Sequence, residues 1–252
     1  NLGFHYFSRR EYEAAAPFLN RAADVRADDF NTQYLLGATL SQLKRTDEAL
    51  QHWRVAQKLQ PTNVRLLQLL VVEYGKGRYF NEAASTAQLA LEAAPSDLNL
   101  YLLAIKARQD AGDQRGAGDI AKRAVELFPD SARANFEHGF YLQKIGDVEG
   151  ATVFLKKAMA LDSTYEEPPF FLGDLLVKLG KVEEAIPHLQ AAIAIRKDYI
   201  PARVLLARAL MKVDRQSEAL QELNETVKLA PSHPQPHLLL SQIYFRIGDE
   251  DR

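Results

Sequence analysis

The sequence predicts an all-α solenoid of tandem helix-turn-helix repeats, each 34 residues long. Prolines recur at this spacing at Pro61, Pro95 and Pro129, and Pro231 lies three further periods along the chain. When Phe30 is taken as position 1 of a repeat, position 20 is alanine in every repeat that contains it: Ala15, Ala49, Ala83, Ala117, Ala151, Ala185 and Ala219. A fixed period of this length is typical of stacked units that bury their apolar faces against one another.

The period divides the chain into about seven and a half repeats, which we expect to form one solenoid domain over residues 1–252. The predicted repeats are 1–29, 30–63, 64–97, 98–131, 132–165, 166–199 and 200–233, followed by a partial repeat at 234–252. No stretch alternates apolar and polar residues as a half-buried strand does, so each repeat is predicted to be purely helical.

Each repeat is predicted to hold two helices separated by a turn. Glycine ends the first helix at Gly112, Gly146, Gly180 and Gly248. Small residues, glycine at position 8 and alanine at positions 20 and 27, are expected where the helices approach closely. Position 33 is predicted to cap the first helix of the next repeat, because its residues are all of N-cap type: Asp28, Thr62, Ser96, Asp130, Thr164, Asp198 and Ser232.

The residue types that recur at fixed positions of the repeat resemble those of a known repeat family. Leucine and glycine at positions 7 and 8, a large residue at position 11, alanine at 20 and 27 and proline at 32 are similar to the tetratricopeptide repeat pattern, and they cover the whole chain. The resemblance implies antiparallel helix pairs stacked into a right-handed superhelix. It also implies that the first helix of each pair lines the concave inner surface.

Composition and spacing argue against several classes of function. A net charge of −2 provides no excess of Lys and Arg for binding the phosphates of nucleic acid. The chain has no cysteine, and its six histidines are scattered over the repeats. We therefore predict a protein that is not an enzyme and that uses no cofactor and no metal.

The sequence gives little information on localisation. No apolar run approaches the roughly 20 residues that a membrane-spanning helix needs. The first ten residues do not resemble a signal peptide. These features favour a soluble, cytoplasmic protein over an exported one, and they do not identify the compartment.

The resemblance implies that positions 2, 5, 9, 12 and 13 of the first helices face the groove. The candidate partner-binding residues at these positions are Tyr34, Lys106, Arg133, Phe136, Phe140, Lys144, Phe170, Asp174, Lys178 and Arg208. We expect an aromatic wall around the fifth and sixth repeats, with Phe140 outside the hairpin core, so that its replacement by alanine leaves folding nearly intact. Position 13 forms a ridge with five cations: Lys76, Lys144, Lys178, Lys212 and Arg246.

These features predict a non-catalytic scaffold that binds an extended or helical peptide in the groove. The apolar side chains of that peptide would contact the aromatic wall, and its acidic groups would approach Arg133, Lys144 and Lys178. The residues that related domains use to hold chaperone tails, and the asparagine ladder of related sugar transferases, are absent in register. Two alternatives stay open: a targeting arm of a larger enzyme, such as a glycosyltransferase, and a self-assembling structural superhelix.

The ends of the chain also carry an expectation. The last repeat contains a first helix without a second, and this helix is apolar around most of its circumference: Leu238, Leu239, Leu240, Ile243, Tyr244, Phe245 and Ile247. At the other end, Asn1 falls at position 6 of its repeat, so the opening residues of that first helix are missing. We therefore expect the parent protein to extend past both ends of this chain. Because exposed apolar surface is unfavourable, we also expect that the isolated chain can pair end to end.

Overall fold

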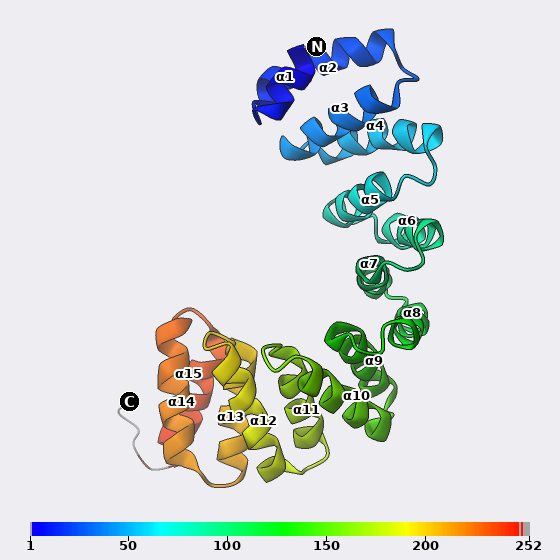
Figure 1. Cartoon of the computed structure of the whole chain (residues 1–252). Helices are drawn as coiled ribbons and strands as arrows, with labels where there is room; N and C mark the ends of the chain where they lie inside the picture. Colours follow the sequence, from blue (N-terminus) through cyan, green and yellow to red (C-terminus); the bar gives the residue numbers. More distant parts are fainter. Residues whose placement is uncertain (1, 247, 249–252) are drawn as a thin grey trace. The chain divides into compact units, whose positions relative to one another are not determined.

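The computed structural model describes residues 2–246 and residue 248. Over these residues fifteen helices follow one another and no strand occurs (Figure 1). The predicted all-α fold class is confirmed.

The helices alternate between the first and second members of the predicted hairpins. The first helices are α1 (Leu2–Ser8), α3 (Phe30–Gln42), α5 (Val64–Lys76), α7 (Leu98–Asp110), α9 (Ala132–Ile145), α11 (Glu167–Lys178), α13 (Ile200–Lys212) and α15 (Pro234–Arg246). The second helices are α2 (Tyr12–Val25), α4 (Thr46–Leu59), α6 (Phe80–Ala93), α8 (Gln114–Leu127), α10 (Val148–Leu161), α12 (Val182–Ile195) and α14 (Gln216–Leu229).

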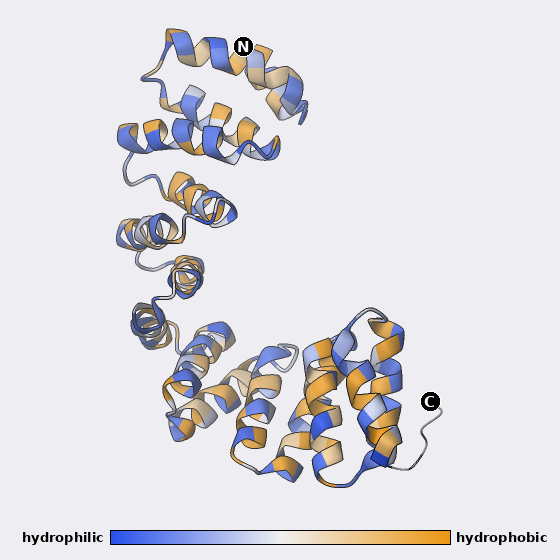
Figure 2. Cartoon of the chain, turned by 180° about the vertical axis from the view of Figure 1, so that it is seen from behind, coloured by the Kyte–Doolittle hydropathy of each residue, from blue (hydrophilic) through white to orange (hydrophobic). Residues whose placement is uncertain are grey.

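The chain forms two compact units, Asn1–Leu127 and Phe128–Arg252, hereafter unit 1 and unit 2. In each unit the two helices of a hairpin pack on each other, and each second helix packs on the first helix of the next hairpin. Apolar and polar residues are interleaved along the helices (Figure 2), as amphipathic helices require. A single domain over residues 1–252 stays a prediction.

The small residues of the repeat lie where helices approach most closely. All seven alanines at position 20 are buried. A Cβ atom added to Gly37 in α3 would lie 2.4 Å from the Cδ1 atom of Trp53 in α4, and one added to Gly173 in α11 would lie 2.7 Å from Leu189 in α12. The prediction that position 8 permits close helix packing is confirmed for these hairpins.

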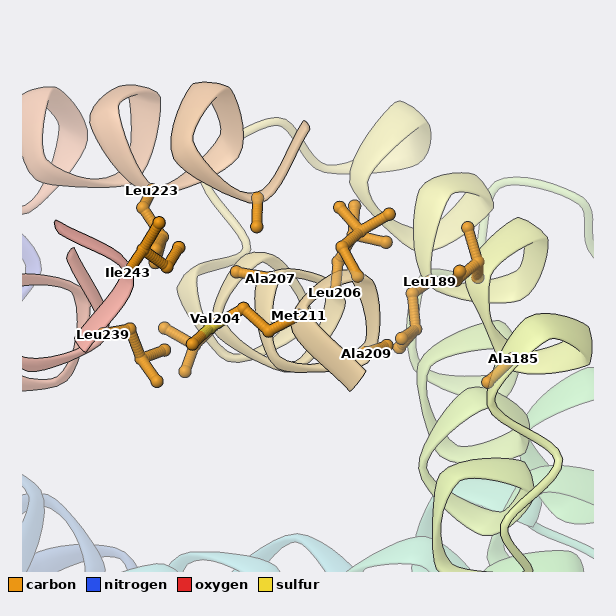
Figure 3. Packing of buried hydrophobic residues seen from close by; sticks show 13 residues of the cluster. Ala185, Leu189, Val204, Leu206, Ala207, Ala209, Met211, Leu223, Leu239 and Ile243 are labelled. Carbon is orange, nitrogen blue, oxygen red and sulfur yellow. The ribbon is translucent and has the colours of Figure 1, made fainter. Parts of the chain in front are cut away.

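Apolar side chains fill the space that the small residues leave. In unit 2 one cluster joins four successive helices, and Figure 3 shows Leu189 of α12, Leu206 of α13, Leu223 of α14 and Ile243 of α15 within it. Because each helix shares this cluster with its neighbours, the hairpins of the unit stabilise one another.

The last helix of unit 2 is covered on one side. Leu239 and Ile243 of α15 are buried, whereas Leu238 and Phe245 are exposed. Ile247 lies outside the described residues. End-to-end self-association through this helix stays a prediction.

The capping residue is position 34, one residue later than predicted. Asp29, Asn63 and Ser131 each accept a hydrogen bond from a backbone amide at the start of the next helix, over 2.7, 3.1 and 3.2 Å. Because the first helices of these repeats begin at position 1, the residue immediately before them is the N-cap, and position 33 belongs to the preceding turn. The assignment of the cap to position 33 was therefore wrong.

A hydrogen bond that the sequence pattern did not indicate ties successive repeats together. In five repeats the side chain at position 4 of the first helix bonds to the backbone carbonyl of position 32 in the turn before it. These pairs are Gln33 with Ala27, Tyr101 with Pro95, Asn135 with Pro129, Arg203 with Lys197, and His237 with Pro231. The bond fixes the inter-repeat turn against the next first helix.

The turn inside each hairpin requires a left-handed residue at position 15. Glycine provides it four times, at Gly112, Gly146, Gly180 and Gly248, with φ between 75° and 84°. The other four turns use residues with a Cβ atom at φ between 57° and 61°: Arg10, Lys44, Arg78 and Asp214. These four turns are strained, since a side chain in this region costs roughly 1–2 kcal/mol.

Replacing Arg78 by glycine is therefore expected to raise the free energy of unfolding of unit 1 by about 1 kcal/mol. Gly112→Ala makes the reverse change at position 15 of the next repeat. It is expected to lower the free energy of unfolding by a similar amount, because an added Cβ meets nothing within 4 Å and only the backbone strain changes. Urea unfolding followed by the fluorescence of Trp53, the single tryptophan, measures both effects. A destabilised Arg78→Gly variant would contradict the strain argument.

Candidate partner-binding face

Exposed and partly exposed residues recur at the same positions of the first helices within each unit. We call this surface the first-helix face and define it by positions 2, 9 and 13 of α3, α5 and α7 in unit 1 and of α9, α11, α13 and α15 in unit 2. Positions 9 and 13 are neighbours on one side of a helix because they are four residues apart. Every residue at position 13 is exposed: Gln42, Lys76, Asp110, Lys144, Lys178, Lys212 and Arg246.

Phe136 does not belong to this face, although the sequence placed it there. Its side chain in α9 is only 7 % exposed. It packs with Leu155 and Leu172, and its ring centroid lies 5.4 Å from that of Phe171 in α11. Position 5 therefore points toward the neighbouring first helix, and Phe136 contributes to the core between hairpins rather than to a free groove wall.

Phe140 and Phe170 are half-buried at the edge of the same aromatic cluster. The Phe140 ring lies 4.9 Å from Phe171 between centroids, and the Nζ atom of Lys144 lies 5.0 Å from the Phe140 centroid. The Phe170 ring lies 5.0 Å from that of Tyr199. The premise that Phe140 lies outside the core is corrected, because its ring packs on Phe171; that its replacement by alanine leaves folding nearly intact stays a prediction.

Several predicted cations are already paired along their own helices. The Nζ atom of Lys178 lies 2.6 Å from an oxygen of Asp174 on α11, and Lys106 pairs with Asp110 on α7 over 2.5 Å. The amide of Gln143 in α9 also donates to Asp174 over 2.9 Å. These pairs neutralise most of the local charge, so Lys106 and Lys178 offer less to an acidic partner than the sequence suggested.

The remaining predicted residues occupy separate places on the first helices. Tyr34 in α3 is half-buried and its ring lies 5.7 Å from that of Phe30. The backbone carbonyl of Tyr34 accepts a hydrogen bond from Nε1 of Trp53 over 3.0 Å. Arg133 at the start of α9 and Arg208 in α13 are exposed. Within unit 2 the structure brings together Phe140, Lys144, Phe170, Asp174 and Lys178; Tyr34 and Lys106 lie on helices separated by α5.

Each unit has a pocket that opens between successive first helices, and the one in unit 1 is also lined by Phe80 and Ala83 of the second helix α6. The unit 2 pocket has a volume of about 550 Å³ and is lined by Arg208, Met211, Lys212, Asp214, Leu238, Leu239, Gln242 and Arg246. The unit 1 pocket has a volume of about 180 Å³ and is lined by Val71, Val72, Gly75, Phe80, Ala83, Leu103, Lys106, Ala107 and Asp110. In both, positions 9 and 12 of one helix face positions 6 and 9 of the next.

The sequence prediction included only Arg208 and Lys106 among these pocket residues. Lys212 and Arg246 were visible in the sequence as part of the ridge at position 13 but were not assigned to a site. Met211, at position 12, lies at a position expected to face the groove but was not named as a candidate, and Leu239, at position 6, lies outside the expected groove positions.

The charged cluster at the start of α11 is closed on itself. The guanidinium of Arg196 lies 2.7 Å from a carboxylate oxygen of Glu166 and 3.7 Å from the ring centroid of Tyr199. Burial, together with the nearby carboxylate of Glu167, raises the pKa of Tyr199 to about 12. The phenol therefore stays protonated at neutral pH, and this cluster has the properties of a structural contact.

A tetratricopeptide repeat family model matches residues 176–243, which run from the end of α11 into α15. Residues 176–243 carry tetratricopeptide repeats. This match confirms the resemblance drawn from the sequence, and the helices of both units follow the same 34-residue spacing.

Two solved structures share the fold at low identity. YrrB, described as a protein of this type with an unusual peptide-binding site, superposes with a TM-score of 0.58 and is 20% identical, covering 73% of this chain and 95% of YrrB. PilF of Pseudomonas aeruginosa superposes with a TM-score of 0.65 and is 15% identical, covering 86% of this chain and 99% of PilF. These likenesses show the fold.

A sequence relative is the human protein O-mannosyl-transferase TMTC3. The two are 26% identical over 145 residues, which make up 57% of this chain and 14% of the human protein. The chain therefore spans a small part of that relative.

The described residues contain neither a metal-ligand cluster nor a helix that could cross a membrane. Among residues 2–246 and 248, no three His, Asp or Glu side chains are grouped as metal ligands would be. Over the same part of the chain, every helix is too short or too polar to cross a bilayer.

Proposed function

We propose that this chain is a non-catalytic scaffold that binds a peptide or a helix of another protein on its first-helix face. One observation carries the proposal. The two units have pockets between the same positions of successive first helices, so the repeat presents the same kind of opening at two places along the chain. Concave sites with an apolar lining and a few polar groups are where proteins bind ligands.

Each pocket contains an exposed apolar side chain beside charged groups, and both are used in partner recognition. In unit 1, Val72 is 49 % exposed at the pocket, beside the ion pair of Lys106 with Asp110. In unit 2, exposed Leu238 lies beside cations of α13 and α15. Apolar contact area would provide most of the affinity, and the charged rim would provide selectivity and association rate.

The candidate residues of the aromatic cluster extend this face in unit 2. Phe140 and Phe170 are partly exposed, Lys144 lies over the Phe140 ring, and Arg133 is an exposed cation at the start of α9. Phe136 is left out of the proposed contact surface because it is buried. The peptide-binding site described for YrrB supports the class of function, because the two proteins share the fold.

A second candidate is a recruiting arm of a larger enzyme, and the match to TMTC3 favours it. In that case the same face would hold a substrate protein or a partner while catalysis takes place elsewhere. This alternative concerns what the scaffold is attached to, and it leaves the proposed binding face unchanged.

The test begins with peptides selected from a displayed random library against the whole chain. Their affinity is then compared between two double variants. Val72→Asp with Arg208→Glu alters position 9 in both pockets, and we expect binding to weaken at least tenfold. The control, Leu89→Asp with Lys157→Glu, makes the same kinds of change at exposed residues of second helices and is expected to leave affinity unchanged. Failure to select any binder, or equal losses from both variants, would overturn the proposal.

A further inference from the structure

The pocket between α13 and α15 combines an apolar floor with a basic rim. Met211 of α13 and Leu239 of α15 are almost completely buried in the floor, and Leu238 beside them is 58 % exposed. Figure 3 shows Leu239 directed toward Val204 of α13, within the core cluster that supports this floor. The floor is thus held in place by the core, while Leu238 is available to a ligand.

Three cations surround this floor. Arg208 and Lys212 lie four residues apart on α13, and Arg246 lies at the end of α15. All three are exposed, and none forms an ion pair with another described residue. Asp214 is the one carboxylate among the described lining residues, and it likewise forms no ion pair with them.

Two other first helices, α7 and α11, pair the cation at position 9 or 13 with a carboxylate four residues away. On α11 the cation at position 13 pairs with a carboxylate at position 9, Lys178 with Asp174. On α7 the same two positions carry the reverse pair, Lys106 with Asp110. On α13 position 9 is instead a second cation, Arg208, and on α15 it is the neutral Gln242.

The consequence is an unbalanced positive charge at this pocket. Like charges four residues apart on a helix repel each other, so the arrangement of Arg208 and Lys212 is unfavourable in the free protein. A ligand with carboxylates would remove this repulsion, and an arginine fork binds a carboxylate with two hydrogen bonds.

We infer that this pocket binds an acidic segment of a partner protein, with one large apolar side chain against Leu238 and the floor and flanking carboxylates on Arg208, Lys212 and Arg246. The inference rests on the proposed function and assigns the chemistry of the partner at one place on the face. The apolar floor favours this ligand over a nucleic acid, whose phosphates would contact the cations alone.

The probe is a short fluorescein-labelled peptide in which aspartates flank two leucines. Fluorescence anisotropy on the whole chain is expected to show saturable binding that weakens as salt is added. Changing the leucines to serine, or the aspartates to asparagine, is expected to weaken binding at least tenfold. Arg208→Glu with Lys212→Glu is expected to do the same, while the control Lys157→Glu on α10 keeps wild-type affinity. All the replaced side chains are exposed, and circular dichroism confirms that each variant stays folded.

The outcomes separate this inference from the proposed function. If library-selected peptides bind the first-helix face but the aspartate-leucine probe does not, the inference is overturned and the proposed function stands. Probe binding that is unaffected by the leucine-to-serine change, or equal binding of phosphatidylserine vesicles or single-stranded DNA, would overturn it as well, because charge alone would then explain the site. If neither the probe nor any selected peptide binds, both proposals fail.

Discussion

Replacing Gly37 by alanine is expected to lower the free energy of unfolding of unit 1 by about 2–3 kcal/mol. The added Cβ would lie 2.4 Å from Cδ1 and 2.5 Å from Nε1 of Trp53. Trp53 cannot easily move, because its ring is buried and its Nε1 donates to the carbonyl of Tyr34 over 3.0 Å. The helices of this hairpin would have to separate, and core contacts would be lost.

Gly75→Ala in α5 is the matched control for this change. It also replaces a glycine inside a first helix of unit 1, but an added Cβ meets nothing within 4 Å. Alanine is favoured over glycine in a helix by about 1 kcal/mol, so this variant is expected to be more stable than the wild type. Urea unfolding followed by both circular dichroism and Trp53 fluorescence measures the two effects. Equal changes in the two variants would mean that helix propensity, and not the contact with Trp53, determines the result.

Replacing Glu73 by alanine is expected to lower the free energy of unfolding of unit 1 by about 2–3 kcal/mol. The carboxylate of Glu73 is 1 % exposed and accepts hydrogen bonds from Ser41 Oγ over 2.7 Å, Thr46 Oγ1 over 2.8 Å and Lys76 Nζ over 2.8 Å. It therefore joins α3 and the start of α4 to α5. Without it, two hydroxyl groups and an ammonium group lose their shared acceptor.

The same contact predicts a dependence of stability on pH. Burial alone would raise the pKa of Glu73, but the hydrogen bonds from Lys76, Ser41 and Thr46 outweigh burial and hold the pKa below its ordinary value of 4.5. A lowered pKa in the folded state means that the stabilisation is complete above pH 4.5 and is lost as the pH falls through the folded-state value. The stability difference between wild type and Glu73→Gln should shrink over that acidic range.

The exposed Glu48 provides the control for both measurements on Glu73. Its carboxylate pairs with Arg45 at the surface of unit 1, where solvent screens the interaction. Glu48→Gln is expected to leave stability nearly unchanged. If Glu73→Ala were equally neutral, or if the pH dependence of Glu73→Gln matched that of the wild type, the network around Glu73 would not be a stabilising contact.

The repeat pattern predicted the helices well because their spacing depends on small residues that must meet. Alanine at position 20 and glycine at position 8 allow close packing. At Gly37 there is no room beside Trp53 for a residue with a Cβ atom. The capping residue was misplaced by one, because positions 33 and 34 both carry cap-type residues in several repeats. Arg78 at the left-handed turn position was missed, since only glycine signals that conformation in a sequence.

Contacts between repeats were much harder to predict than the repeats themselves. The bond from position 4 to the preceding turn is made by glutamine, tyrosine, asparagine, arginine and histidine, so no single residue type marks it. Phe136 was assigned to the groove by its repeat position, yet a large ring at that position fills the space between α9 and α11. The α13–α15 pocket depends on side chains from two helices, and of its lining residues only Arg208 was named as a candidate from the sequence.

The central claim, that the first-helix face binds a segment of another protein, is tested most directly by one ratio of dissociation constants. A single library-selected peptide is titrated into Val72→Asp with Arg208→Glu and into Leu89→Asp with Lys157→Glu. Val72 and Leu89 are matched in exposure at 49 % and 45 %, so the two variants differ in the face that they change. We predict that the first variant binds at least tenfold more weakly than the second. A ratio near one, with both variants folded, would contradict the claim.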